Sequence, residues 1–241
     1  MKLYVIGTGP GGALEMTMRA RQAVEACEVV AGYEFYLGLI GELLDGKEII
    51  STGMTGETER CNAAIQAALS GKTVCVISGG DAGLYGMASL VLELAEKYPQ
   101  IEAEVIPGVT AACSASAVLG APVSQDFAAI SLSDRLTGWS VIENRLRLAA
   151  QADFVICLYN PASNARKKHL KNACEIIMER RSPKTPCGVV KNVGRAGEKR
   201  ELLSLAELCD YKADMFTTVV IGNSATRIIN GRLITPRGYI L

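Results

Sequence analysis

The stretch Val74-Cys-Val-Ile-Ser78-Gly-Gly-Asp-Ala-Gly-Leu-Tyr-Gly86 says most about the fold and about the kind of site the chain carries. Its first residues predict a buried strand that delivers a glycine pair and the Asp81 carboxylate to its carboxyl end. Ligands bind at that edge in open α/β sheets. Because Asp81 would repel a phosphate, the stretch favours a ligand with hydroxyls, an amino group or a positive centre. A purely structural turn is the alternative interpretation.

Strand-length apolar runs alternate with helix-length amphipathic segments on both sides of this stretch. In the first half, strands are predicted over Leu3–Ile6, Glu28–Ala31, Glu48–Ile50, Thr73–Ile77 and Ala103–Ile106, and helices after Gly12 and over Glu57–Leu69 and Leu84–Lys97. This alternation predicts an α/β fold with a largely parallel sheet and helices on its faces. The small residues of Ala111–Ala117 predict a close-packed helix.

Turn-forming residues over Gly120–Asp126 predict a domain boundary, which gives domains of residues 1–120 and 121–241. The second half begins again with strands. They are expected over Phe127–Leu132, Asp153–Tyr159, Cys187–Val190 and Thr217–Ile221, with helices around Ser140–Ala150 and Asn164–Arg181.

Composition limits the class of protein. With 241 residues, 49% of them hydrophobic, the chain can bury a substantial core, and its apolar runs fall far short of the ~20 residues that span a bilayer. The 25 basic and 25 acidic residues cancel, so no nucleic-acid or membrane partner is expected. The eight scattered cysteines predict buried small hydrophobes and no metal site. We therefore expect a soluble, cytoplasmic protein with a small-molecule substrate.

A second glycine-rich segment, Gly7-Thr-Gly-Pro-Gly-Gly12, follows a predicted strand and formally matches the dinucleotide-binding fingerprint. That fingerprint also requires an acidic residue at the end of the second strand. The second strand here runs into Ala31-Gly32-Tyr33, and Glu34 comes only after the turn. The segment is therefore open to three interpretations: a nucleotide-binding loop, a tight turn, or a loop whose glycines make room for a bulky ligand.

Five motifs in one order and spacing carry a resemblance to a known family. They are Gly-x-Gly-Pro-Gly at 7–11, Ser-Gly-Gly-Asp at 78–81, Pro-Gly-Val-Thr-Ala at 107–111, Tyr159-Asn160 after a strand, and Lys191-Asn192-Val193. Along almost its whole length the chain resembles the tetrapyrrole methylases. The resemblance implies two α/β domains with S-adenosylmethionine in the cleft between them, and a homodimer.

In proteins similar to this one, the cofactor contacts fall at particular motif positions. Here they are Pro10, Gly79, Gly80, Asp81, Leu84, Thr110, Ala111, Asn160 and Val193.

Three further stretches resemble most closely the branch that methylates carbon 17 of precorrin-3B or cobalt-precorrin-3 and contracts the ring. They are Gly80–Ala88, Ser131–Trp139 and Ile234–Tyr239. Arg135 and Gly138 depart from the branch pattern, which leaves the role of that loop open. The resemblance implies either a cobalt-free or a cobalt-loaded substrate, and we favour the cobalt-loaded form.

Ring contraction requires a proton to be moved, and Asp134 is the predicted catalytic residue, with Tyr85 as a possible helper. The substrate carries acetate and propionate groups, so Arg60, Arg135 and Lys191 are the predicted substrate-binding cations. Arg195 is a further candidate beside the family motifs. His169, the single histidine, follows a basic stretch. This pattern predicts that His169 lies either on a solvated helix face or in contact with a substrate carboxylate.

Other functions are compatible with the same patterns. They are another corrin-ring methyltransferase, a dinucleotide-dependent oxidoreductase, a relative that methylates RNA or a translation factor, and a non-enzymatic binder of a nucleotide-like effector.

Overall fold

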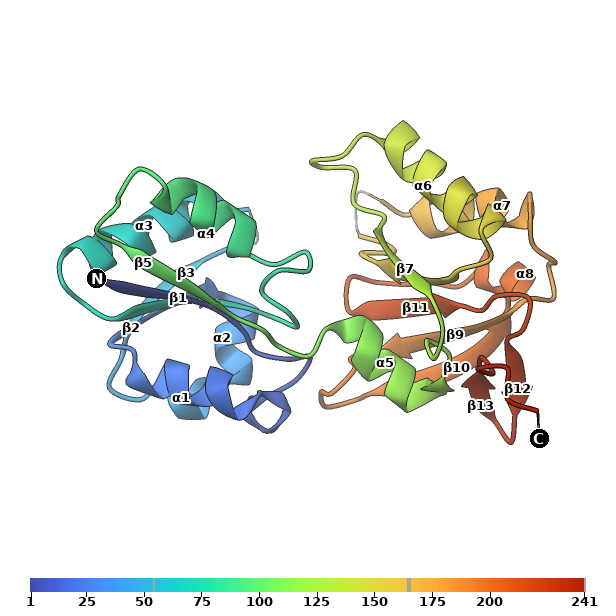
Figure 1. Cartoon of the computed structure of the whole chain (residues 1–241), viewed down its shortest axis with the longest axis horizontal. Helices are drawn as coiled ribbons and strands as arrows, with labels where there is room; N and C mark the ends of the chain where they lie inside the picture. Colours follow the sequence, from blue (N-terminus) through green and yellow to red (C-terminus); the bar gives the residue numbers. More distant parts are fainter. Residues whose placement is uncertain (54, 164–165, 241) are drawn as a thin grey trace. The chain divides into compact units, whose positions relative to one another are not determined.

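The computed structural model describes residues 1–53, 55–163 and 166–240. Contacts between residues divide the chain into two compact units, Met1–Ala111 and Ala112–Leu241. Figure 1 labels most of the helices and strands of each unit.

The first unit is a five-stranded parallel sheet in the order β3-β2-β4-β1-β5. Its elements run β1 Lys2–Gly7, η1 Ala13–Glu15, α1 Met18–Ala26, β2 Val29–Tyr33, α2 Glu34–Leu39, η2 Gly41–Leu43, β3 Glu48–Thr52, α3 Glu57–Leu69, β4 Val74–Ser78, α4 Ala88–Ala95 and β5 Glu102–Ile106.

Helices cover both faces of this sheet because alternate residues of a strand point to opposite sides. Leu3 and Val5 of β1 pack in one core with α3 and α4, whereas Ile6 packs in another with α1 and α2. Figure 1 shows these two helix pairs on opposite faces. The inner strands β1, β2 and β4 are mostly buried on both sides, which explains why they read as nearly continuous apolar runs, whereas the edge strands β3 and β5 are more exposed.

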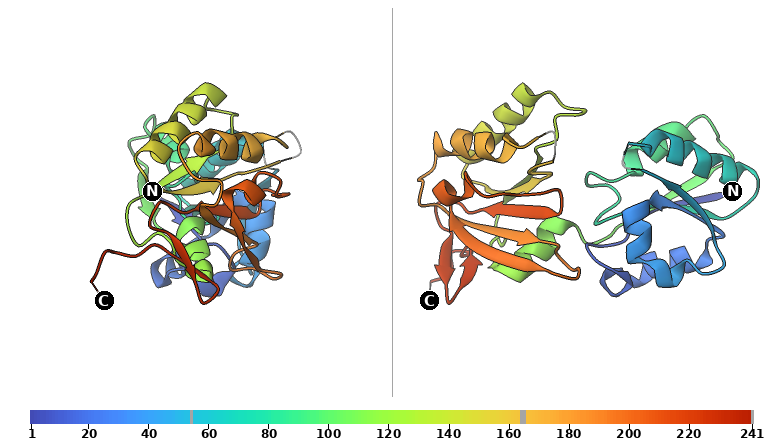
Figure 2. Two further views of the ribbon diagram at one scale, coloured as in Figure 1. Left: turned by 90° about the vertical axis from the view of Figure 1, so that its right-hand side faces the viewer. Right: turned by 180° about the vertical axis from the view of Figure 1, so that it is seen from behind.

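The second unit is a mixed five-stranded sheet in the order β10-β9-β11-β8-β7, with a small sheet β12-β13-β6 beside it. Its elements run α5 Ala111–Leu119, β6 Gly120–Ala121, β7 Phe127–Ser131, α6 Trp139–Gln151, β8 Val155–Tyr159, α7 His169–Met178, β9 Pro186–Lys191, β10 Lys199–Ser204, α8 Leu205–Leu208, β11 Thr217–Ile221, β12 Arg227–Ile229 and β13 Arg232–Ile234. Helices α6, α7 and α8 share one core with the large sheet, and Figure 2 shows this unit from two further sides.

The α/β fold class predicted from the alternation is confirmed, and α3 and β11 have the predicted bounds. The contacts divide the chain before Ala112, ahead of the predicted boundary at 120, because α5 packs with the second unit. Leu119 lies so close to Gly188 of β9 that a Cβ there would be 2.5 Å from its side chain. The backbone N–H of Ala112 also donates to the Tyr159 hydroxyl, at 2.9 Å.

Some elements differ from the sequence prediction. Asn164 and Ala165, where a helix was predicted to begin, lie outside the described residues, and α7 begins at His169. The hairpin of β12 and β13 was missed. Its turn, Asn230-Gly231, has φ angles of 50° and 69°, and Asn-Gly is the usual sequence of a two-residue hairpin turn.

Candidate active site

Three loops of the first unit meet at the carboxyl edge of its sheet, after the neighbouring strands β1, β4 and β5. Thr8 donates both its backbone N–H and its hydroxyl to the carbonyl oxygen of Ser78, at 2.9 and 3.1 Å. Gly9 and Gly80 exchange two backbone hydrogen bonds of 3.0 and 2.7 Å. The loops therefore form one interlocked structure.

Glycine is required where these loops touch. A Cβ on Gly108 would lie 2.2 Å from the Gly80 carbonyl oxygen, and a Cβ on Gly7 would lie 2.6 Å from the Gly108 nitrogen. Gly80 has a φ of 73°, a left-handed conformation that L side chains rarely adopt. At Gly7 and Gly108 the missing side chain makes room for neighbouring backbone.

The Asp81 carboxylate ties two of the loops together. Its Oδ1 accepts from the backbone N–H groups of Gly83 and Leu84, at 2.8 and 2.9 Å, and its Oδ2 accepts from Gly108, at 3.1 Å. A carboxylate has about four lone-pair positions, so most of its accepting capacity is used within the protein. The hydrogen bonds that the Asp81 side chain accepts therefore hold the loops around it in place.

The same hydrogen bonds argue against a dinucleotide site at Gly7–Gly12. The fingerprint requires free backbone amides and a helix that begins at the last glycine. Here the amides of Thr8 and Gly9 are bonded to Ser78 and Gly80, and a short 3₁₀ helix precedes α1, which begins at Met18 after the Thr17 cap.

Six of the seven cofactor residues predicted in the first half lie on these three loops, and the seventh, Ala111, begins α5 directly after the third loop. Pro10 is on the first loop, Gly79, Gly80, Asp81 and Leu84 are on the second, and Thr110 is on the third. Gly79 is covered by Tyr36, whose ring would be 2.5 Å from an added Cβ. Tyr85, on the second loop, is half exposed and has a φ of 58°, which is unusual for an aromatic residue.

Arg60, a predicted substrate contact, is buried in α3 with 4% of its surface exposed. Nη1 donates to the Thr52 hydroxyl, and Nη2 contacts the Met87 sulfur, a weak acceptor, at 3.6 Å. Among the described residues no carboxylate pairs with it, and its Nε has no hydrogen-bond partner. A buried cation in this condition is costly unless an anion joins it.

In the second unit, β7, β8 and β9 run parallel to one another and end at one edge. Asn160 follows β8 with a φ of 52°, and its amide donates to the Ser131 hydroxyl at the end of β7, at 3.0 Å. Val193 is buried just beyond β9. The motif residues of this half therefore lie at a common sheet edge.

Lys191, a predicted substrate contact, already faces a carboxylate. Its Nζ is 2.6 Å from Asp214 Oδ2. Burial raises the pKa of Asp214, but hydrogen bonds from Lys191, Thr217 and Phe216 outweigh burial, so this pKa lies below its usual value. Arg135 has an exposed side chain on the loop before α6, and the Arg195 guanidinium lies 5.8 Å from the centre of the Phe216 ring.

Asp134, the predicted catalytic residue, pairs with the single histidine. His169 Nε2 is 3.1 Å from Asp134 Oδ2, and the histidine side chain is 18% exposed. The prediction of a solvated helix face for His169 is therefore wrong, because Trp139 and Asp134 cover the ring. The two residues of the pair are far apart in the sequence, so no local pattern could have revealed it.

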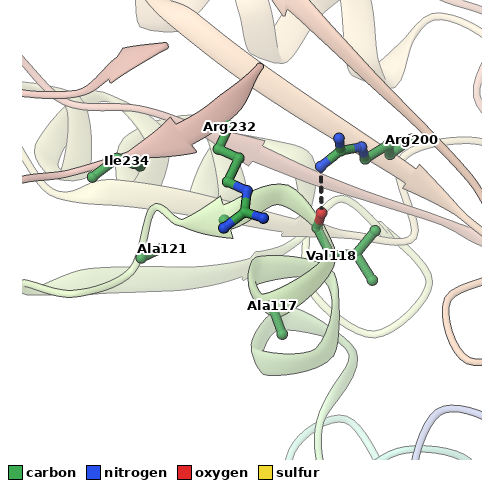
Figure 3. A pocket seen from close by; sticks show the side chains of 7 residues that line it. Ala117, Val118, Ala121, Arg200, Arg232 and Ile234 are labelled. Atoms are coloured by element: carbon green, nitrogen blue, oxygen red, sulfur yellow. Dashed lines mark hydrogen bonds between the residues drawn. The ribbon is translucent and has the colours of Figure 1, made fainter. Parts of the chain in front are cut away.

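A pocket of about 330 Å³ lies elsewhere in the second unit (Figure 3). Arg200 and Arg232 line it together with Ala117 and Val118 of α5. Arg200 donates to the Val118 carbonyl oxygen at 2.9 Å, so its charge stabilises the carboxyl end of that helix. The predicted site residues do not line this pocket.

These features define an α/β protein of two units, each of which gathers glycine-rich or polar loops at the carboxyl edge of its sheet. The family model of the tetrapyrrole (corrin/porphyrin) methylases matches residues 2–209. The chain belongs to this family.

Individual relatives are similar over the full length. The chain is 48% identical to a probable cobalt-factor III C(17)-methyltransferase of Salmonella typhimurium, over 99% of this chain and 100% of the relative. It is 41% identical to a precorrin-3B C(17)-methyltransferase of a Sinorhizobium species, over 98% and 96%. The crystal structure of the methyltransferase CobJ superposes with a TM-score of 0.90 at 33% identity, over 97% and 99%. The chain spans about half the length of some other curated relatives.

Proposed function

We propose that the protein is an S-adenosylmethionine-dependent methyltransferase of cobalamin biosynthesis. It methylates carbon 17 of precorrin-3B or its cobalt-loaded counterpart, and the ring contracts to precorrin-4 or cobalt-precorrin-4. The observation that carries this proposal is the 48% identity, over the whole chain, to a relative named for C(17) methylation of cobalt-factor III. The cobalt-loaded substrate is favoured for the same reason.

The residues proposed to hold the cofactor are those on or directly after the interlocked loops, Pro10, Gly79, Gly80, Asp81, Leu84, Thr110 and Ala111, together with Asn160 and Val193 of the second unit. This set fits a sulfonium compound. Its one charged side chain is the Asp81 carboxylate, and none of the nine residues is a cation that would repel a positive centre. When bound, S-adenosylmethionine supplies an electrophilic methyl group.

The chain's own contribution to methyl transfer is alignment. Holding two reactants in register contributes effective molarities of order 10⁵–10⁸ M. The interlocked loops suit this role, because backbone hydrogen bonds and close glycine contacts leave little freedom at Gly9 and Gly80.

A direct assay tests this function. The protein is incubated with methyl-labelled S-adenosylmethionine and the trimethylated precursor, with and without cobalt, and the product is examined by mass and absorption. We expect one added methyl group and a contracted ring. A methylated but uncontracted product would point to another corrin-ring methyltransferase of the family.

The oxidoreductase alternative predicts a different cofactor. We expect S-adenosylhomocysteine to raise the melting temperature and NAD to leave it unchanged, because the amides of Thr8 and Gly9 are already bonded. The opposite result would overturn the proposal. RNA binding that weakens steeply with salt would favour the RNA-methylating relatives.

For the substrate we propose that Arg60, Arg135 and Lys191 contact its carboxylates. Arg60 gives the sharpest test, because it is a buried cation without a carboxylate partner among the described residues. A buried charge without an ionic partner is costly, so replacing it with an apolar side chain of similar size removes that cost. Arg60→Met should therefore leave the free energy of unfolding unchanged or higher while raising KM for the tetrapyrrole at least tenfold.

Arg180→Met is the matched control for Arg60→Met, since Arg180 is an exposed arginine outside the motif loops. It should change neither KM nor stability. A large loss of stability in Arg60→Met, with an unchanged KM, would assign Arg60 a purely structural role.

We also propose that the protein is a cytoplasmic homodimer, which the family resemblance supports. Within the described residues no helix is long and apolar enough to cross a membrane. Light scattering coupled to gel filtration should give twice the 25.6 kDa mass of the chain. A monomer at micromolar concentration would contradict the dimer.

A further inference from the structure

His169 has the surroundings of a functional histidine. It is the single histidine of the chain and begins α7. Its ring centroid lies 4.6 Å from that of Trp139, with the rings inclined at 75°, and its Nε2 is 3.1 Å from Asp134 Oδ2. A ring held by an edge-to-face aromatic contact and, at one nitrogen, by a carboxylate has a defined orientation.

The neighbours of His169 are themselves fixed. Trp139 Nε1 donates to Glu143 Oε1 at 2.8 Å. The hydrogen bond from His169 is the largest cause that holds the pKa of Asp134 below its usual value, and the charge of Arg166 acts in the same direction. The carboxylate therefore stays ionised at neutral pH. The charged groups close to His169 include Asp134, Arg166 and Glu143, which accepts from Trp139, and the exposed Lys167, Lys168 and Lys171 flank it in the chain.

This arrangement decides which histidine nitrogen can exchange a proton. A carboxylate at Nε2 favours the tautomer with the proton on Nε2, which leaves the lone pair on Nδ1 as an acceptor. The carboxylate also fixes the orientation of the ring, as in other histidines that act as a general base beside a carboxylate.

The pair lies at the edge of the second sheet that carries the motif residues. Asp134 is on the loop that follows Ser131, and the Ser131 hydroxyl accepts from both Ser133 N–H, at 3.2 Å, and Asn160, at 3.0 Å. Asn160 is one of the proposed cofactor contacts. Proton exchange at His169 would thus occur in the same loop cluster as cofactor binding.

We propose that His169 is the catalytic acid–base residue of ring contraction and that Asp134 is its positioning residue. This rests on the proposed function. Nδ1 takes the proton of a substrate oxygen, so that an O–H bond breaks, an N–H bond forms and the electron pair stays on oxygen. The imidazolium later returns the proton to the product or to solvent, and no electrons pass to or from the protein.

The test compares His169→Gln with the wild-type protein. Glutamine keeps a group that can reach Asp134 but has no titratable nitrogen. General acid–base catalysis contributes typically 10²- to 10⁴-fold, so ring contraction should slow by at least 10²-fold. Labelled methyl incorporation should fall much less, and the melting-temperature shift with S-adenosylhomocysteine should be unchanged. The pH–rate profile should lose one limb, because the variant lacks the titratable group.

Two further variants separate catalysis from packing. Asp134→Asn keeps the imidazole, so its pH–rate profile should keep the limb that His169→Gln loses, whereas ring contraction should slow because the ring has lost the carboxylate that orients it. Glu143→Gln removes a charge from the same cluster and keeps an acceptor for Trp139, so its rate should stay within about twofold of wild type. Ring contraction by His169→Gln within threefold of wild type, with the limb retained, would overturn the proposal.

A measurement on the wild-type protein is independent of how the variants fold. In untagged protein the imidazole NMR signal belongs to His169 alone, since the chain has one histidine. The chemical shift of this signal should change when the tetrapyrrole product binds. An unchanged chemical shift would show that the product does not contact Nδ1 of His169. If the wild-type protein transfers no methyl group to the precursor, the proposed function fails instead.

Discussion

The carboxyl edges of the two sheets are built in different ways. In the first unit, backbone groups of Gly9, Gly80 and Gly108 meet one another or the Asp81 carboxylate directly. In the second unit, side chains meet in pairs, such as Asp134 with His169 and Lys191 with Asp214. The first edge is held mainly by close backbone contacts that only glycine permits, and the second edge is held by contacts between side chains.

This difference determines which amino-acid substitutions each edge tolerates. Backbone that touches backbone cannot move aside, so an added methyl group must displace a loop. Side chains at a partly exposed edge can change rotamer or be solvated, so the loss of one partner has a local effect. We therefore expect substitutions at the first edge to alter folding and those at the second to alter chemistry.

The largest effect on stability is expected for Gly108→Ala. The new Cβ would lie 2.2 Å from the Gly80 carbonyl oxygen and 2.6 Å from Gly7 backbone atoms. Overpacking costs typically 1–3 kcal/mol and more where backbone must move, so we expect a loss of about 3 kcal/mol or more. Urea unfolding measures the loss, and the response to S-adenosylhomocysteine should disappear with it.

Gly41→Ala is the control in the same unit, because a Cβ there would meet nothing within 4 Å. Its effect should stay within about 0.5 kcal/mol. Equal stabilities for the two variants would show that the loops are not tightly interlocked.

A smaller effect is expected for Asp81→Asn. The amide retains one acceptor oxygen, but its NH₂ group then faces a backbone N–H that Asp81 now satisfies. An unsatisfied buried donor costs about 1–3 kcal/mol, and because these donors are only partly buried or exposed we expect a loss of about 1 kcal/mol in urea unfolding. Asp45→Asn, on an exposed loop, should cost about 0.5 kcal/mol or less. A loss no larger than that of the control would mean that Asp81 does not hold the loops.

The smallest effect is expected at the second edge, for Lys191→Met. Both partners of its ion pair are partly exposed, so the loss at pH 7 should be about 0.5–1 kcal/mol. The pKa of Asp214 is lowered in the folded state, so the stability from this group is present above its ordinary pKa and is lost as the pH falls through the lowered value. The difference between wild type and variant should therefore vanish in acid.

Urea titrations at neutral and acid pH check this prediction, with the exposed Lys212→Met as control. A difference that stays constant with pH would mean that the ion pair does not contribute.

Much of the fold and part of the site could be predicted from local sequence. Apolar alternation located the strands of the parallel sheet, and the glycines of 7–11, 78–81 and 107–111 marked the loops at its edge. The Asn230-Gly231 dipeptide is typical of a hairpin turn, but the hairpin was not predicted. Strand β10 was harder to predict, because Lys199, Arg200 and Glu201 begin it at an exposed sheet edge.

The position of α5 could not be predicted. Its small residues indicate close packing but do not identify the segments against which the helix packs. The contacts of Ala112 and Leu119 with the second unit involve partners far along the chain.

The sequence by itself determined the α/β fold class, the family and the three glycine loops, because strand periodicity and the glycine requirement of tight backbone contacts are local properties. Only the tertiary structure decided that Asp81 binds backbone amides, that Arg60 is a buried cation and that His169 pairs with Asp134. Each of these depends on groups that distant segments bring together, and on how much water is excluded around them. The charge of a side chain follows from the residue type, whereas the group with which it interacts depends on the fold.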